Sequence, residues 1–211
     1  MIVVLEGPDG VGKDTVADGL VRLLAQEGYN ACIAAEPPKT SIGEFFRDTV
    51  LCMSSQVKTS PTLDALLLIA ARRENYERFI PEYLNTNDVV IVTRNWMTLE
   101  CYQLWEIDNI LASNLSSISK QIEVELVDPD QLVQILLYCE YSVTKERMKS
   151  RGTIDKVEAR GDEYLSRVNA RYAELIGEPG ISTVDAKQTK EQVLKDTYDI
   201  IIEAFAKRNL K

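Results

Sequence analysis

The chain has 211 residues, 45% of them hydrophobic and 27% charged, which is ordinary for a globular protein with a single domain over 1–211. Lysine and arginine total 24 and aspartate and glutamate total 33, so the formal net charge of −9 argues against a dedicated nucleic-acid or anionic-membrane binder. Histidine is absent, which excludes Ser-His-Asp and Cys-His catalysis and zinc bound by histidine.

Short apolar runs alternate with longer amphipathic ones, a pattern typical of a parallel sheet flanked by helices. In chain order we expect strand Ile2–Leu5, helix Lys13–Glu27, strand Ala31–Ala35, helix Ile42–Met53, helix Thr62–Leu84, strand Val89–Thr93, helix Thr98–Asn114, strand Gln134–Cys139, strand Ser182–Asp185 and helix Gln192–Lys207. Pro81 is expected to kink its helix, because proline lacks an N–H group. The sequence therefore predicts an α/β fold with five parallel strands.

The segment Lys149–Asp162 differs from the rest of the chain, because it is crowded with charge and contains Gly152 and Gly161. Such a composition is typical of exposed segments that carry function rather than of a core. We expect a mobile lid here.

The first expected strand runs into Gly7-Pro8-Asp9-Gly10-Val11-Gly12-Lys13, which has the P-loop spacing G-x4-G-K. Glycines let successive N–H groups point at phosphate oxygens, and the following helix N-terminus favours anions. The lysine brings positive charge to the β- and γ-phosphates. We therefore expect ATP to bind through Gly7, Gly10, Val11, Gly12, Lys13, Asp14 and Thr15.

One position departs from that motif, because Asp14 follows the lysine where serine or threonine would hold Mg²⁺. A carboxylate binds magnesium well but repels phosphate. The alternatives are that Asp14 binds the metal, or that it points away and stabilises the first helical turn. In the second case Asp9 and Thr15 are expected to hold Mg²⁺.

The four cysteines, Cys32, Cys52, Cys101 and Cys139, lie far apart and form no CxxC pair. A disulfide framework and a zinc ribbon are therefore not expected, and a reducing, cytoplasmic location fits. No apolar run approaches the roughly 20 residues of a membrane span. We also expect no signal peptide, because glycines and charges follow the short apolar start Met1–Leu5. We expect the partners to be small nucleotides rather than nucleic acid or a membrane.

Further motifs follow the P-loop. They are Glu36-Pro37, Leu66-Leu67-Leu68-Ile69-Ala70-Ala71-Arg72-Arg73, Thr93-Arg94-Asn95 with Thr98 and Cys101-Tyr102-Gln103, Arg151-Gly152 with Asp155-Lys156-Val157-Glu158, and Val184-Asp185-Ala186. Together with the P-loop and in this order, they resemble the thymidylate kinase family over nearly the whole chain. The resemblance implies the three-layer P-loop fold of nucleoside monophosphate kinases, a homodimer, and the reaction of ATP with dTMP to give ADP and dTDP.

The resemblance also implies roles for single residues. Arg94 matches the arginine that holds the acceptor phosphate, Arg73 the arginine that binds the thymine ring, and Ile69 the aromatic residue that stacks on this ring. Thr98 matches a serine at the base edge. Tyr102 is expected to pack against the deoxyribose, where it leaves no space for a 2′-hydroxyl group.

Other residues are expected around the phosphates. Glu36 and Arg47 are expected beside the acceptor, and Asp9 is expected to position Mg²⁺ or the transferring phosphate. The lid residue expected to act in transfer is Arg151, with Lys156 and Arg160 as the next choices. Arg147 is expected to bind ATP, and Arg72, which replaces an acidic residue of the family, is expected to be solvated. The residues expected in catalysis are Lys13, Asp9, Arg94 and Arg151.

Three substitutions leave the acceptor open: Thr93 replaces an aspartate, Asn95 a tyrosine and Ile69 the stacking aromatic residue. One alternative keeps the chemistry but uses another or a 5-modified deoxypyrimidine monophosphate. A second alternative is a regulatory P-loop protein without transfer activity, which Thr93 and Asp14 favour and Arg94 opposes. A small P-loop ligase would not explain the later motifs.

Overall fold

The computed structural model describes residues 1–153 and 155–209. The strands are β1 (Ile2–Glu6), β2 (Ala31–Ala35), β3 (Val89–Thr93), β4 (Leu132–Tyr138) and β5 (Ile181–Asp185). The helices are α1 (Lys13–Gln26), α2 (Ser41–Phe46), α3 (Pro61–Glu74), α4 (Ile80–Leu84), α5 (Trp96–Tyr102), α6 (Asn109–Leu126), α7 (Tyr141–Arg151), α8 (Asp162–Glu174) and α9 (Lys190–Asn209).

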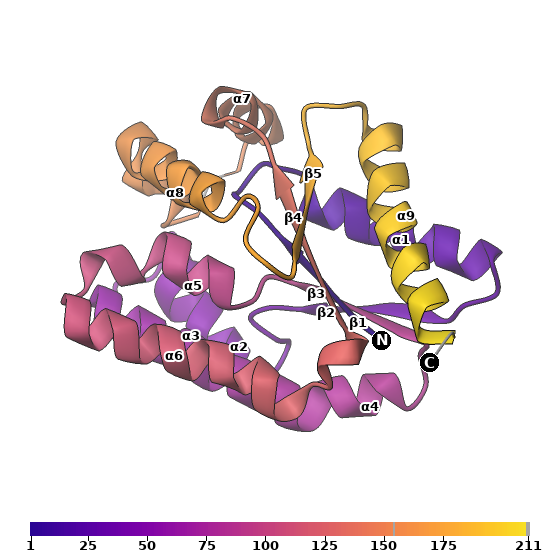
Figure 1. Cartoon of the computed structure of the whole chain (residues 1–211). Helices are drawn as coiled ribbons and strands as arrows, with labels where there is room; N and C mark the ends of the chain where they lie inside the picture. Colours follow the sequence, from indigo (N-terminus) through magenta and orange to yellow (C-terminus); the bar gives the residue numbers. More distant parts are fainter. Residues whose placement is uncertain (154, 210–211) are drawn as a thin grey trace.

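The five strands form one parallel sheet in the order β2-β3-β1-β4-β5 (Figure 1). Leu5 of β1 lies opposite Thr93 of β3 and Ile135 of β4. The P-loop and Arg94 therefore leave neighbouring strands at the same edge of the sheet. In such sheets, ligands bind at the carboxyl ends of the strands. The five parallel strands with helices on both faces confirm the predicted α/β class.

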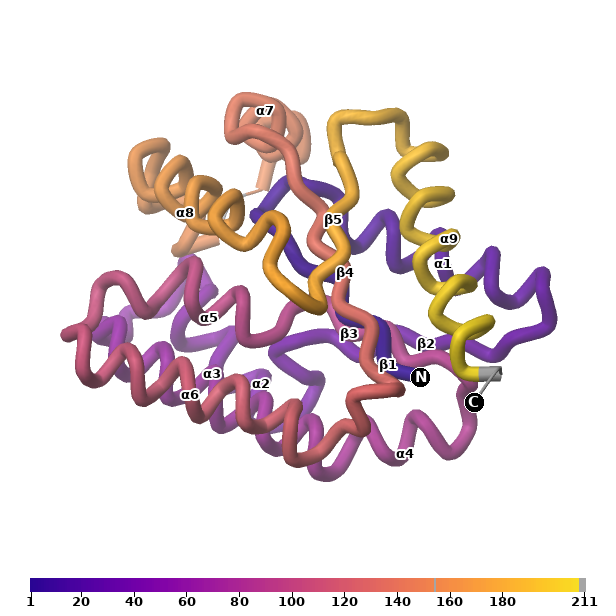
Figure 2. Tube along the Cα trace, viewed as in Figure 1, coloured from indigo at the N-terminus to yellow at the C-terminus, as the bar shows by residue number. Residues whose placement is uncertain are grey.

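Alternate strand residues cover the two faces of the sheet, as the pleat requires. Val3 and Leu5 pack in a core with α1 and α9, whereas Ile2 and Val4 pack in a second core with α3 and α6. Figure 1 shows α1 and α9 on one face and α2 to α6 on the other, with α7 and α8 near the carboxyl ends of the strands. β1 begins next to the last turns of α9 (Figure 2).

The predicted strands agree with the structure to within two residues, but three predicted helices are divided. The helix expected over Ile42–Met53 consists of α2 and a π-helical turn at Arg47–Leu51. The helix expected over Thr62–Leu84 consists of α3, a π-helical turn at Asn75–Phe79, and α4. Pro81 lies in the first turn of α4, and the wider turn before it accommodates the missing N–H group. The single helix expected over Thr98–Asn114 is wrong, because α5 ends at Tyr102 and Asp108 caps the separate helix α6.

The predicted lid range, 149–162, includes residue 154, which lies outside the described residues. The range begins in the last turn of α7 and ends where α8 begins. Between these helices, Glu158–Arg160 form a short 3₁₀ turn. Across residues 1–153 and 155–209, no helix has the length and apolar character needed to cross a membrane.

Candidate active site

The P-loop joins the end of β1 to the start of α1. Gly7 has a φ of 142°, and a Cβ atom there would lie 2.2 Å from the Leu137 carbonyl oxygen of β4, so only glycine fits. α1 begins at Lys13 after Gly12, and no described side chain caps this end. Its first N–H groups and the positive end of its dipole therefore remain available to an anion.

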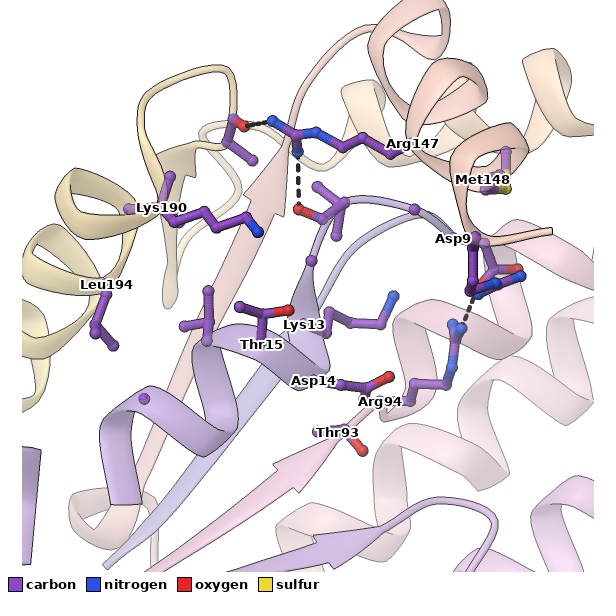
Figure 3. Close-up of a pocket in the computed structure, with 18 of the residues that line it drawn as sticks. Asp9, Lys13, Asp14, Thr15, Thr93, Arg94, Arg147, Met148, Lys190 and Leu194 are labelled. Atoms are coloured by element: carbon purple, nitrogen blue, oxygen red, sulfur yellow. Dashed lines mark hydrogen bonds and ion pairs between the residues drawn. The ribbon is translucent and has the colours of Figure 1, made fainter. Parts of the chain in front are cut away.

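The middle of the P-loop packs directly against α7. A Cβ atom on Gly10 would lie 2.6 Å from the Thr144 carbonyl oxygen of α7. Arg147, also on α7, donates to the carbonyl oxygens of Val11 at 3.2 Å and Ala186 at 2.8 Å (Figure 3). Arg147 thus connects α7 to the P-loop and to the end of β5.

The ammonium group of Lys13 lies inside the curve of the P-loop. Its Nζ donates to the carbonyl oxygens of Gly7 at 2.7 Å and Pro8 at 3.1 Å. Burial, and then the positive charge of Arg94, lowers the pKa of Lys13 to about 8. Because both acceptors are neutral carbonyls, the charge of this lysine is available to a phosphate.

Arg94 faces the P-loop from the end of β3. Its guanidinium forms an ion pair with Asp9 (Figure 3). It also donates to Thr98 Oγ1 at 3.3 Å. Burial alone would raise the pKa of Asp9, but the charges of Arg94 and Lys13 outweigh it and lower that pKa to about 2. Arg94 has a φ of 94°, a conformation that is costly for a non-glycine residue and concentrated at functional sites.

These groups line one cavity of about 800 Å³. It brings together most of the predicted nucleotide- and phosphate-binding residues: Asp9, Gly10, Val11, Gly12, Lys13, Asp14, Thr15, Glu36, Arg47, Arg94, Arg147 and Arg151. Hard oxygen donors of the kind that Mg²⁺ prefers are present on Asp9, Asp14 and Thr15. Within the described part of the chain, no three Cys, Asp or Glu side chains gather into a metal-binding group.

A smaller cavity adjoins the first one and shares Asp9 and Arg94 with it. Its other lining residues are Pro37, Phe46, Leu51, Leu68, Thr98, Tyr102, Gln103, Asp155 and Val157. Tyr102 is fixed there because its hydroxyl accepts a hydrogen bond from the Asp9 N–H group at 3.0 Å. Thr98 and Tyr102 therefore lie together beside Arg94, and their roles towards the base and the sugar stay predictions.

Gln103 belongs to one of the sequence motifs, but the sequence predicts no role for it. Its side chain is 9% exposed, and its buried Oε1 has no hydrogen-bond partner among the described residues. Buried polar groups are nearly always paired, so this carbonyl oxygen is available to a hydrogen-bond donor in the smaller cavity. The sequence signal that could have identified Gln103 as a site residue is its position directly after Tyr102.

The predictions for two residues of α3 are wrong by one position. Ile69 packs in the hydrophobic core, and Leu68 lines the smaller cavity instead. Arg73 is 40% exposed and pairs with two surface glutamates. Arg72, expected in solvent, is completely buried and pairs with Glu36.

The guanidinium of Arg72 is fully engaged inside the protein. Besides Glu36, it donates to Ser119 Oγ at 2.5 Å and to the Asn95 carbonyl at 2.6 Å. Burial raises the pKa of Glu36, although Arg72 opposes this effect. The second oxygen of Glu36 has no hydrogen-bond partner among the described residues.

Three basic residues of the predicted lid, Arg151, Lys156 and Arg160, are held by protein groups. Arg151 pairs with Glu158, and Arg160 pairs with Glu106. The Lys156 ammonium donates to the carbonyl oxygens of Val57 at 3.1 Å and Thr49 at 3.4 Å. Of these residues, only Arg151 lines the large cavity.

Comparison with known proteins identifies the family. The sequence profile described as thymidylate kinase matches residues 5–197. The chain belongs to the thymidylate kinase family. Thymidylate kinases of Campylobacter concisus and of an Exiguobacterium species are each 29% identical to it, over 95% and 96% of this chain and 98% and 94% of their own lengths. The thymidylate kinase of Finegoldia magna is 28% identical over the full length of both chains.

Membership of the thymidylate kinase family confirms the resemblance seen in the motifs. The chain is a nucleoside monophosphate kinase, a phosphotransferase that takes its phosphoryl group from ATP. The matched region extends from the end of β1 into α9, so it contains both cavities and the lid segment.

Proposed function

We propose that this chain transfers a phosphoryl group from ATP to dTMP, giving ADP and dTDP, at the cavity between the P-loop and Arg94. One observation carries the proposal. The cations Lys13 and Arg94 come from neighbouring strand ends, and both act on the Asp9 carboxylate in one cavity. Phosphoryl transfer needs charge neutralisation and alignment more than covalent help, and this arrangement offers both.

On the donor side, the P-loop amides, the α1 terminus and Lys13 bind the phosphates of ATP. The Lys13 ammonium exchanges its two carbonyl partners for phosphate oxygens and neutralises charge on them. Arg147 lines the same cavity between the P-loop and β5, where it contacts the nucleotide. A lysine suits this role because it acts as a compact point charge.

On the acceptor side, Arg94 binds the phosphate of the nucleoside monophosphate. A planar guanidinium binds phosphate through two parallel hydrogen bonds, and Thr98 together with the Tyr102 ring, 5.6 Å from the guanidinium carbon, fixes its position. The smaller cavity receives the nucleoside between the apolar walls formed by Leu68 and Phe46. Tyr102 is the side chain that excludes a 2′-hydroxyl group.

Mg²⁺ fits the oxygen donors of the large cavity. Asp9 and Thr15 would hold it, with Asp14 as a further oxygen donor on the same helix turn. Bound there, the ion would neutralise charge on the phosphates of ATP. The Asp9 carboxylate is kept ionised by Arg94 and Lys13, which suits a metal ligand.

The lid supplies Arg151 to the transferring phosphate. This arginine reaches the large cavity from the end of α7 while it pairs with Glu158. A phosphate group carries more charge than a carboxylate, so ATP competes with Glu158 for the guanidinium. Closure of residues 149–162 over the nucleotides would also exclude water and limit hydrolysis of ATP.

A second candidate acceptor is another or a 5-modified deoxypyrimidine monophosphate. The observation in its favour is that neither arginine of α3 is free to bind the base. Arg73, which was expected there, pairs with two surface glutamates, and Arg72 is engaged by Glu36, Ser119 and Asn95. Among the described residues that line the smaller cavity, Gln103 has a buried Oε1 without a hydrogen-bond partner, and a carboxamide complements several pyrimidine edges. A relaxed base preference follows.

The acceptor is tested by following ADP release with dTMP, dUMP, dCMP, dGMP and 5-hydroxymethyl-dUMP under one set of conditions. We expect a deoxypyrimidine to have the highest kcat/KM, with dTMP first. A preference for dTMP above about 10⁴-fold over every other acceptor would refute the relaxed preference, because it requires about 5.5 kcal/mol of differential binding. Binding of ATP without transfer to any acceptor would favour the regulatory alternative.

Two further proposals concern assembly and location. A homodimer would cover the apolar side chains that α6 exposes, such as Ile110, which is 76% exposed, and Val124, which is 74% exposed. Light scattering of the wild-type chain and of a Val124→Glu variant tests this, since the variant should be monomeric. The four cysteines are free thiols, which supports a reducing cytoplasm.

A further inference from the structure

Glu6 is a buried acid for which the reaction described above has no role. It is the last residue of β1, is 0% exposed, and lies between the P-loop and the turn that follows β3. Its Oε2 accepts hydrogen bonds from the Gly7 N–H group at 3.0 Å and the Tyr172 hydroxyl at 2.9 Å. Its Oε1 accepts from the Asn95 N–H group at 2.6 Å, the Thr98 N–H group at 3.0 Å and the Thr98 hydroxyl at 2.8 Å.

All five of these partners are donors, so the position requires a group that only accepts. A carboxylate has two accepting oxygens, whereas a glutamine would turn its NH₂ group towards one of the donors. The acceptor also orients Thr98, whose hydroxyl proton points at Glu6 Oε1. A lone pair of Thr98 Oγ1 is then left to accept the hydrogen bond from Arg94 Nη1 at 3.3 Å.

Glu6 also holds the main chain around Arg94. The Arg94 N–H group donates to the Leu5 carbonyl at 3.0 Å, and the next N–H group, of Asn95, donates to Glu6. The left-handed conformation of Arg94, with its φ of 94°, therefore lies between two hydrogen bonds to the end of β1. Strained conformations persist only where the surrounding structure determines them strongly.

We propose that Glu6 is a positioning residue that sets the Arg94 guanidinium against the P-loop. It acts through the Arg94–Asn95 turn and through the Thr98 hydroxyl, while its bond to Gly7 fixes the first residue of the loop. This inference rests on the proposed role of Arg94 in binding the acceptor phosphate. A misplacement of about 1 Å can reduce transfer 10²-fold, so the bonds made by Glu6 control the rate.

The test compares Glu6→Gln with Tyr172→Phe in the full chain. Tyr172→Phe removes the bond to Glu6 Oε2 and the 3.2 Å contact of the Tyr172 hydroxyl with Thr98 Oγ1, but it keeps the bonds that Glu6 makes to the Asn95 and Thr98 N–H groups, so its kcat should fall less than about fivefold. Glu6→Gln should lower kcat by about 10- to 100-fold, the range seen when supporting hydrogen bonds are lost. The Kd for ATP should change by less than about threefold, and in an Arg94→Ala background Glu6→Gln should have little further effect on kcat.

The proposal would be overturned if Glu6→Gln and Tyr172→Phe had equal kcat values. It would also be overturned if the double variant with Arg94→Ala showed the product of the two single effects on kcat. If Glu6→Gln does not fold, Glu6→Asp replaces it, because it keeps both accepting oxygens and shifts them by one methylene. Its kcat should fall at least fivefold at an unchanged Tm, and an unchanged kcat would also overturn the proposal. All assays use the acceptor that wild type phosphorylates fastest, so a wrong acceptor assignment is detected separately.

Discussion

Replacing Arg72 by methionine removes a buried cation and leaves the Glu36 carboxylate without its partner. Both side chains are 0% exposed, and the change also deprives Ser119 Oγ and the Asn95 carbonyl of their donor. Removing one partner of a buried ion pair costs about 3–5 kcal/mol. At about 2–4 °C per kcal/mol for a chain of this size, Tm should fall by about 6–20 °C.

The loss of folding stability caused by Arg72→Met should be larger at high pH than at low pH. Burial raises the pKa of Glu36, and Arg72 partly offsets this, so the pKa rises further without the arginine. A carboxyl group whose pKa is raised on folding destabilises the protein above that pKa and no longer does so once it is protonated. The destabilisation by Arg72→Met should therefore be largest near pH 8 and shrink towards pH 5.

Urea unfolding at pH 8 and pH 5, followed by circular dichroism at constant ionic strength, measures both effects. The neighbouring Arg73→Met is the matched control, because its exposed ion pairs should contribute little and leave the midpoint at the wild-type value. Adding Glu36→Gln to Arg72→Met should recover most of the loss. A loss below about 1 kcal/mol at pH 8, or an equal loss at both pH values, would refute this reasoning.

The remaining predictions concern the nucleotides. Lys13→Ala should lower kcat at least 100-fold, or about 2.7 kcal/mol of barrier, with an unchanged circular dichroism spectrum; a fall below about tenfold would exclude the P-loop lysine from catalysis. Wild-type affinity for ATP, measured by calorimetry, should weaken as pH rises through about 8, because Lys13 loses its proton there, whereas Lys13→Arg should show no such fall. Arg94→Ala should raise the KM for dTMP at least tenfold and leave the Kd for ATP within about threefold, and equal losses of both affinities would contradict this division. Hydrogen exchange of residues 155–160 should slow when a bisubstrate analogue binds, and unchanged exchange would argue against a lid.

The strands were predictable because continuous β-branched and aliphatic runs such as Val89–Thr93 are typical of strands buried on both faces. The last helix was also predictable, since α9 spans the expected Gln192–Lys207, but α6 and α7 were not, for two reasons. Asp108 caps α6 by accepting hydrogen bonds from the N–H groups of Ile110 and Leu111. A single aspartate inside a helix-like pattern is a weak signal, so the start of a new helix there was not predicted. α7 buries only Thr144 and Met148, so it has almost no apolar periodicity to detect.

The P-loop residues of the site were predictable because their geometry is local. The α3 residues were not, because Leu68 and Arg72 have the same i, i+4 spacing as Ile69 and Arg73, and spacing alone cannot distinguish the two pairs. What distinguishes them is contact with Glu36, which is distant in sequence and lies against α3 only after folding. The role of a partner that must be brought close by the fold cannot be read from a local pattern.

The close contact between Gly10 and α7 restricts how this enzyme could evolve. A cation placed within the P-loop at position 10 would require a side chain at a φ of 79°, with its Cβ atom 2.6 Å from the Thr144 carbonyl oxygen. A single substitution at Gly10 cannot avoid both the positive φ and the clash with Thr144. To make room for the side chain, α7 would have to move, and Arg147 and the start of the lid segment would move with it. In an ancestor with this packing, a single substitution can add or replace a cationic side chain on the lid. Placing a cationic side chain at position 10 would require several simultaneous substitutions.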